Sequence, residues 1–357
     1  MNIEPFALER WFGKYEHDAD IMLAESGIRS LPASRFDTDP GDLGYVIPTD
    51  GDPEFREEVA ARYGRSADEV IFTCGTQEAN LLAMLATLDD EDHAVVVTPT
   101  YQSLHALPRS LASVSTVELT PPEWNLDPDA VADAIEPNTR LVVVNDPNNP
   151  TGKYHSQDTI DALYDLAADN DAHLLCDEVY RLLADDPIPP VASIGPHAIS
   201  TTSLTKAHGL AGLRFGWLAG PPEVVDAARR WKDYTTISPS VFGQHVARQA
   251  LADEETILDE NRALARDHRE RVGEFLTEYG LDWHEPVGVN AFPTIPEGFD
   301  GSREFCRTVV EEQSVVLAPG DVFGFDDRFR LGFGLPTDEL AEGLERVGRV
   351  IEAHADG

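Results

Sequence analysis

Five apolar, β-branched runs of the chain are each followed by side chains that can do chemistry. A lysine amine, such as Lys206, can bond to a carbonyl carbon and move protons, and a carboxylate, such as Asp177, can hold a cation. The segments are 74–77 after 70–73, 99–101 after 94–98, 145–152 after 141–144, 177–180 after 173–176, and 203–206 after 199–202. They supply a candidate phosphate-binding turn, an aromatic ring, an amide, a carboxylate with a phenol, and a lysine followed eight residues later by Arg214.

The elements that must position these groups alternate along the chain. Helical patterns at 76–88, 127–135 and 156–169 separate continuous apolar runs, and a further strand is expected at 215–219. Apolar strands separated by helices predict a largely parallel sheet covered on both faces. Ligands of such sheets bind beyond the carboxyl ends of the strands, where the polar segments fall.

After about residue 240 the pattern changes. We expect a long helix at 241–279, a strand near 287–294, a helix at 302–312, strands at 315–317 and 329–333, and a final helix. In that last segment, apolar residues recur at helical spacing, as Leu340, Leu344, Val347 and Ile351. This part of the chain therefore reads as a smaller α+β domain.

Composition excludes several classes of protein. The formal net charge of −38 would repel a phosphate backbone, so nucleic-acid binding is not expected. No apolar run reaches 18 residues, the start of the chain lacks a signal-peptide pattern, and the three cysteines are widely spaced. We therefore expect a cytoplasmic protein with reduced thiols, no metal site and no membrane segment. The acidic, lysine-poor composition also suggests a high-salt cytoplasm, where self-repulsion is screened.

Three tetrapeptides in the sequence resemble motifs of a known enzyme family. The sequences NPTG at 149–152, DEVY at 177–180 and SLTK at 203–206, with Arg214, resemble fold-type I pyridoxal-phosphate enzymes of the class I/II aminotransferase group. The order and spacing match over roughly residues 40–335. The resemblance implies an α/β fold with a mostly parallel seven-stranded sheet sandwiched by helices. It also implies an N-terminal arm at 1–39, a large cofactor-binding domain at 40–240, and an interdomain helix with a small domain at 241–357.

The resemblance assigns the catalytic groups. Lys206 would hold pyridoxal 5′-phosphate as a Schiff base and then move the Cα proton of the substrate. Asp177 would pair with the pyridine nitrogen and keep it protonated, which makes the ring a better electron sink. Tyr180 and Asn149 would both bond the phenolate oxygen of the cofactor, and Asn149 would also contact the substrate carboxylate.

The remaining contacts to the cofactor follow from the same resemblance. The backbone amides of Gly75 and Thr76 would bind the phosphate at a helix start. Ser203 and Arg214 would complete the phosphate site, Arg214 through its forked guanidinium. Tyr101 would stack on the ring.

Substrate contacts come from the two ends of the chain. Arg330 would hold the α-carboxylate, because a guanidinium inside an apolar strand needs an anionic partner. Glu25 and Gly27 lie where the family closes its N-terminal arm over the substrate. The N-terminal pattern also resembles that of capreomycidine-synthase-like enzymes, which act on arginine derivatives, so Glu25 could meet a cationic side chain.

Two further contacts are expected from a neighbouring subunit. Tyr45 and Ser238 resemble residues that reach the phosphate of the partner's site, which implies a homodimer with shared active sites. Tyr234 stands where aspartate-type enzymes have an arginine, so a preference for dicarboxylic substrates is not expected.

The sequence does not decide between several reaction types. We expect an aminotransferase that moves an amino group between an amino acid and a 2-oxo acid. A carbon–sulfur β-lyase-like or capreomycidine-synthase-like enzyme would use the same cofactor contacts, since these reactions differ in which Cα bond breaks. A catalytically silent regulatory protein is disfavoured by the joint presence of Lys206, Asp177 and Arg330.

Overall fold

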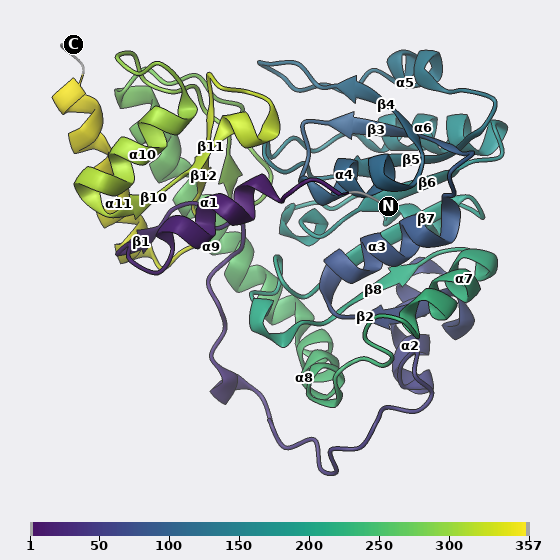
Figure 1. Ribbon diagram of the computed structural model, residues 1–357. Helices are drawn as coiled ribbons and strands as arrows, with labels where there is room; N and C mark the ends of the chain where they lie inside the picture. The colour runs from purple at the N-terminus through teal and green to yellow at the C-terminus, as the bar shows by residue number, and fades with distance from the viewer. Residues whose placement is uncertain (1–2, 355–357) are drawn as a thin grey trace.

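The computed structural model describes residues 3–354, and its larger lobe is built around a seven-stranded sheet (Figure 1). The strand order is β2-β8-β7-β6-β5-β3-β4. β8 (Gly216–Ala219) is antiparallel to both neighbours, and the other pairs are parallel. The other strands are β2 (Val70–Thr73), β3 (His93–Thr98), β4 (Ser113–Glu118), β5 (Thr139–Asn145), β6 (His173–Asp177) and β7 (Ala198–Ser203). The predicted α/β class with a mostly parallel sheet is confirmed.

Both faces of the sheet are covered by helices, which explains the continuous apolar runs. On β3, Ala94 and Val96 pack toward α3 (Gly75–Thr87), α4 (Ser103–Leu111) and α7 (Pro222–Lys232). The alternate residues Val95 and Val97 pack toward the opposite layer, which contains α5 (Pro128–Ala134) and α6 (Gln157–Asp169). Each strand thus buries side chains on both sides, as its pleat requires.

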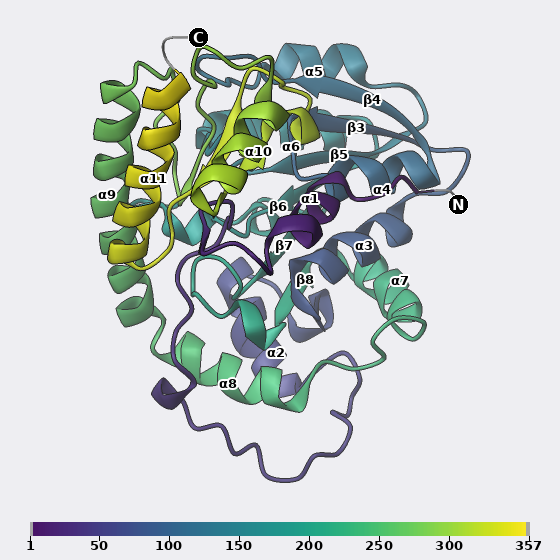
Figure 2. The ribbon, with the colours of Figure 1, turned by 60° about the vertical axis from the view of Figure 1, so that its left-hand side comes forward.

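A second lobe follows the sheet. It contains α9 (Glu254–Glu278), α10 (Ser302–Gln313) and α11 (Thr337–His354), with α11 beside α9 (Figure 2). Its antiparallel sheet has the order β11-β12-β9, from β11 (Ala318–Pro319), β12 (Phe329–Gly332) and β9 (Asn290–Ala291). The helix expected at 241–279 is two helices, α8 (Val241–Ala252) and α9, because Asp253 leaves helical geometry at φ −106° and ψ 21°.

The N-terminal segment joins the two lobes. α1 (Ala7–Tyr15) is anchored to the second lobe by its Trp11 indole, which donates to the Leu317 carbonyl at 2.8 Å. The backbone N–H of Ala7 donates to Gln102 Oε1 at 2.7 Å, just before α4. Further on, β1 (Ile21–Met22) pairs in parallel with β10 (Val315–Val316). These contacts fix α1 between the second lobe and the lobe that contains the large sheet.

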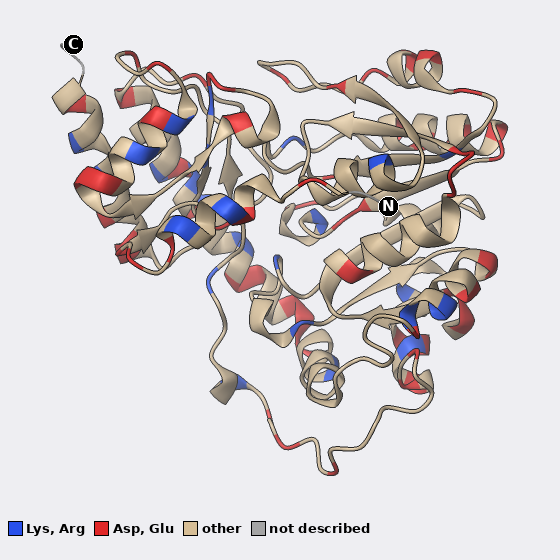
Figure 3. Ribbon diagram, in the orientation of Figure 1, with Lys and Arg blue, Asp and Glu red and all other residues tan. Residues whose placement is uncertain are grey.

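A helix and an irregular segment precede the sheet in the chain. α2 (Pro53–Ala60) packs against β2, and the segment 37–50 before it contains no helix or strand (Figure 1). Acidic residues outnumber basic ones on both lobes (Figure 3). None of the helices between residues 3 and 354 is long and apolar enough to cross a membrane.

Candidate active site

A cavity of about 290 Å³ lies at the carboxyl ends of β5, β6 and β7. It is bounded by the start of α3 on one side and by α1 and β12 on the other. Ten residues singled out from the sequence line it: Glu25, Thr76, Tyr101, Asn149, Asp177, Tyr180, Ser203, Lys206, Arg214 and Arg330. Residues scattered over three hundred positions of the chain therefore meet in one space.

Lys206 brings its amine into this cavity from the turn after β7. The half-buried Nζ donates to Ser26 Oγ at 2.8 Å and lies 6.0 Å from the centre of the Tyr180 ring. A side chain at Gly27 would begin 3.8 Å from Lys206 Cδ and 3.9 Å from Nζ. Gly27 therefore leaves open space beside the amine, which a ligand bonded to Nζ could occupy.

Asp177 is the last residue of β6 and is buried. Its carboxylate accepts from Asn80 Nδ2 at 2.8 Å and from the Val179 N–H at 3.2 Å. Burial nevertheless raises the pKa of Asp177 to about 6, although these hydrogen bonds and the Lys206 ammonium act to lower it. A cationic ligand atom beside this carboxylate would stabilise its ionised form.

Asn149 and Arg330 meet at the floor of the cavity. Arg330 Nη1 donates to Asn149 Oδ1 at 3.0 Å, and Nη2 donates to the Ala24 carbonyl at 2.7 Å. The guanidinium is buried, its Nε has no hydrogen-bond partner, and burial lowers its pKa. Among residues 3–354 no carboxylate forms a salt bridge with it. A buried cation in this state calls for an anionic ligand.

The turn that holds Asn149 follows from its sequence. The Asn145 Oδ1 accepts from the Asn149 N–H at 2.7 Å, and the Asn145 amide donates to the Asp177 carbonyl at 2.9 Å. Asn148 Oδ1 accepts from both the N–H and the hydroxyl of Thr151, at 3.2 and 2.8 Å. Asparagines favour such turns because their side chains bond to nearby backbone.

The start of α3, with Ser203 and Arg214, forms a corner of hydrogen-bond donors, which we call the phosphate corner. Thr76 Oγ1 donates to Ser203 Oγ at 2.8 Å, and the residue before the helix, Cys74, provides no side-chain cap. Gly75 has φ +76°, and Arg214 lies over it with Nη1 on the Ala211 carbonyl at 3.1 Å. Free N–H groups, two hydroxyls and an exposed guanidinium fit a phosphate.

Gly75→Ala should weaken binding of the cofactor about tenfold, roughly the loss of one charge-assisted hydrogen bond. An added Cβ would come within 2.8 Å of Arg214 Nη2 and displace that side chain. The matched control is Gly64→Ala, since Gly64 also has a positive φ (+65°) but open space around it. Both variants should lose stability, and equilibrium titration should find weaker cofactor binding in Gly75→Ala alone. Equal affinities would contradict the prediction.

Two aromatic rings complete the lining. The Tyr101 hydroxyl donates to Glu9 Oε1 at 3.1 Å, and burial together with the Glu9 charge raises the pKa of Tyr101. The Tyr101 ring lies 5.0 Å from that of Phe6. Tyr180 is buried, and its ring edge lies 3.8 Å from the position of a Cβ at Gly288.

Several residues of the cavity were missed from the sequence. They are Ser26, Asn80 and four residues on one face of α1 and its C-terminal cap: Leu8, Glu9, Phe12 and Glu16. The α1 residues recur at helical spacing, so an amphipathic N-terminal helix could have been recognised. The resemblance indicated that the N-terminal arm closes over the substrate, but not which of its residues face the cavity.

Tyr45 and Ser238 do not line the cavity of this chain. Tyr45 is 76% exposed within the segment 37–50, and Ser238 lies in the turn before α8. The expectation for both concerned a neighbouring subunit, which a single chain does not contain.

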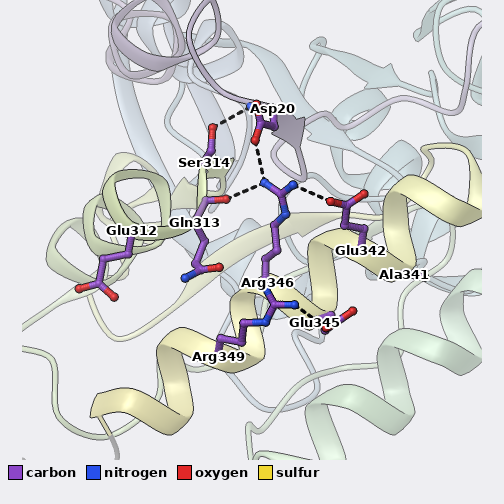
Figure 4. Close-up of a pocket in the computed structure, with 9 residues that line it drawn as sticks. All are labelled: Asp20, Glu312, Gln313, Ser314, Ala341, Glu342, Glu345, Arg346 and Arg349. Carbon is purple, nitrogen blue, oxygen red and sulfur yellow. Dashed lines mark hydrogen bonds and ion pairs between the residues drawn. The ribbon is translucent and has the colours of Figure 1, made fainter.

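A larger hollow, of about 660 Å³, lies between β1 and the helices α10 and α11 (Figure 4). Its arginines are already paired: Arg346 donates to Asp20 at 2.8 Å and to Glu342 at 2.5 Å, and Arg349 donates to Glu345 at 2.5 Å. The pair with Asp20 fastens the N-terminal segment to α11, and the other two lie within that helix. No cluster of side chains able to hold a metal ion occurs in the described part of the chain.

Comparison with known proteins agrees with this geometry. The family model for aminotransferase class I and II matches residues 13–347. The capreomycidine synthase of Streptomyces vinaceus is 33% identical, over 98% of this chain and 94% of that protein. The aspartate/prephenate aminotransferase of Thermus thermophilus is 31% identical, over 95% and 89%. A PLP-dependent aminotransferase structure from Streptococcus suis has a TM-score of 0.93 at 29% identity, with 99% of each chain covered.

The fold and the cavity define a fold-type I pyridoxal-phosphate enzyme. The chain belongs to the class I and II aminotransferase family, and it is a pyridoxal-phosphate-dependent aminotransferase whose substrates are an amino acid and a 2-oxo acid. The residues present fit the cofactor: a primary amine, a buried carboxylate and an anion-binding helix start surround one cavity.

Proposed function

We propose that the described cavity is the site of transamination, with Lys206 as the residue that moves the proton. The observation that supports this most is that the Lys206 amine, the Asp177 carboxylate and the Arg330 guanidinium all line one cavity. When bound, pyridoxal phosphate supplies an electron sink for the carbanion at the substrate Cα. The chain's own groups must then bind, orient and transfer protons.

Each group has a definite task in this proposal. The Lys206 amine would take the proton from the substrate Cα as a general base and, once protonated, would deliver it as a general acid across the substrate nitrogen, which completes a 1,3-shift. Asp177 places negative charge beside the ring nitrogen, and Tyr180 and Asn149 present hydrogen-bonding groups to the ring oxygen. Tyr101 would cover the ring face. The Gly75 and Thr76 amides, Ser203 and Arg214 would hold the phosphate.

We propose that the substrate lies between Arg330 and α1. Arg330 and Asn149 bind the α-carboxylate, so the side chain points to the wall formed by Leu8, Phe12 and the acids Glu9, Glu16 and Glu25. A side-chain carboxylate would meet like charges at this wall. We therefore propose neutral or basic amino acids, rather than dicarboxylic ones, as preferred donors.

A panel of amino donors tests the proposal. Single-turnover reactions with neutral and basic amino acids should release the matching 2-oxo acid. Aspartate should react with a kcat/KM about tenfold below that of asparagine, because one like-charge contact costs on the order of 1 kcal/mol at a half-exposed wall. Release of ammonia, or a cyclic product from an arginine derivative, would instead favour the lyase or cyclase, an alternative supported by the similarity to capreomycidine synthase.

We further propose a homodimer in which Tyr45 and Ser238 reach the partner's phosphate site. Large apolar side chains are exposed on the two segments that carry them, among them Leu43 (68%), Ile47 (82%) and Tyr234 (86%). Such patches mark protein–protein contacts. Arg214 is also exposed beside the phosphate corner, which leaves room for a partner. A monomer in equilibrium sedimentation would contradict this arrangement.

The charge of −38 supports a high-salt cytoplasm as the working environment. Concentrated KCl reduces the Debye length to about 3 Å at 1 M and so screens the acidic surface. The melting temperature should rise with KCl concentration, and a fall would overturn this part of the proposal.

A further inference from the structure

Asn80 is a buried amide whose position the catalytic assignments leave unexplained. It lies on α3, it lines the cavity, and it is 1% exposed. Its Nδ2 donates to Asp177 Oδ2 at 2.8 Å, while Asp177 Oδ1 accepts from the Val179 N–H at 3.2 Å. Each carboxylate oxygen thus has one neutral donor from the protein, and each keeps a further lone pair for a ligand.

The orientation of the Asn80 amide is itself held in place. The hydroxyl of Thr201, on β7, donates to Asn80 Oδ1 at 2.5 Å, and Thr201 is fully buried. With the Thr201 hydroxyl donating to the amide oxygen, the NH₂ group is the end that faces Asp177. In this orientation the amide stabilises the ionised carboxylate.

Asn80 also links the two ends of the proposed cofactor site. It is four residues after Thr76, so both side chains lie on one face of α3, about 6 Å apart along its axis. Thr76 bonds to Ser203 in the phosphate corner, and Asn80 bonds to Asp177 at the far end. One rigid helix therefore relates the two groups that would hold the phosphate and the ring nitrogen.

We propose that Asn80, oriented by Thr201, is a positioning residue that keeps the Asp177 carboxylate ionised and aimed at the cofactor's ring nitrogen. This inference rests on the proposed function, in which Asp177 pairs with that nitrogen. It assigns a role to a neutral side chain on α3 that the sequence motifs do not include. Among the described residues, Lys206 is the charged group that acts on Asp177. It would remain in place in every Asn80 or Thr201 variant.

The test measures the protonation state of the cofactor's ring nitrogen directly. The enzyme is loaded with pyridoxal phosphate labelled with ¹⁵N in the ring, and the nitrogen shift is followed by NMR against pH. In Asn80→Leu and Thr201→Val, the pH at which the ring nitrogen loses its proton should fall by about one unit, as expected for the loss of one hydrogen bond to an ionised group. Thr201→Ser keeps the hydroxyl and should match the wild type.

The outcomes separate this inference from the function on which it rests. If Asp177→Asn leaves the ring titration unchanged, the assignment of Asp177 fails, and the role of Asn80 falls with it. If Asp177→Asn shifts the titration but both Asn80→Leu and Thr201→Val leave it unchanged, only the role of Asn80 is overturned. A purely structural role would lower the melting temperature without moving the titration. If Asn80→Leu does not fold, the milder Thr201→Val against Thr201→Ser decides.

Discussion

Lys206→Ala should lower kcat by roughly 10⁴-fold or more, the upper end of what a positioned acid–base group contributes. The Lys206 amine is half-buried, lines the cavity and donates a hydrogen bond to the Ser26 hydroxyl. Lys14, Lys153 and Lys232, the other lysines of the chain, do not line the cavity. Stopped-flow measurement of the first half-reaction would give the rate.

Two controls accompany this variant. Lys206→Arg keeps a cation near Asp177 but lacks a primary amine, and it should be as inactive as Lys206→Ala. Lys232→Met removes a lysine that is buried against Glu78 at 3.5 Å, and it should lose stability while keeping proton transfer. The wild type should absorb in the visible with pyridoxal phosphate bound, and the band should be lost in Lys206→Ala. A Lys206→Ala enzyme with near-normal turnover would show that another group moves the proton.

The sequence was most informative at the strand ends. In a parallel sheet covered on both faces, most strand residues are apolar, and the charged and catalytic side chains gather where the strands end. Asp177 at the end of β6 and Lys206 just after β7 follow this rule, and both line the cavity. Local pattern and global position thus agree, which is why these residues could be placed without a structure.

The sequence was least informative where the physical signal is weak or distant. β4 was missed because it is an edge strand with little burial, and its Ser113, Ser115 and Glu118 lack an apolar pattern. Asn80 was missed because a buried asparagine in a helix gives no sign of its partner, Asp177, which lies 97 residues later. The contact of α1 with the cavity depends on packing between lobes, which periodicity does not predict.

The role of Arg330 could be predicted only in part from the sequence. A guanidinium inside an apolar strand predicted an anionic partner, and the structure places it at the cavity with two neutral oxygens, Asn149 Oδ1 and the Ala24 carbonyl. Neither oxygen neutralises its charge. No carboxylate of the described chain pairs with the Arg330 guanidinium. We therefore assign the substrate's α-carboxylate to this residue.

Arg330→Gln should lower kcat/KM for α-amino acids by roughly 30- to 4,000-fold. Removing one partner of a buried, hydrogen-bonded charge pair costs about 2–5 kcal/mol, and 1.4 kcal/mol corresponds to a factor of ten. Cofactor binding should change far less than kcat/KM, because the phosphate corner and Asp177 lie on other elements, although Arg330 also bonds to Asn149. An amine without a carboxylate should lose far less than an amino acid of the same side chain, and comparing the two in single-turnover kinetics isolates the carboxylate contact.

Arg328 offers the matched control. It is also buried, it lies two residues earlier, and it donates to the Phe292 carbonyl at 3.1 Å above the ring of Trp124, but it does not line the cavity. Arg328→Gln should lower the melting temperature and leave the discrimination between amino acid and amine intact. If Arg328→Gln and Arg330→Gln lose that discrimination equally, the loss reflects the damage done by removing a buried cation. The α-carboxylate would then have to be bound elsewhere, and Arg214 at the phosphate corner is the other arginine that the cavity offers.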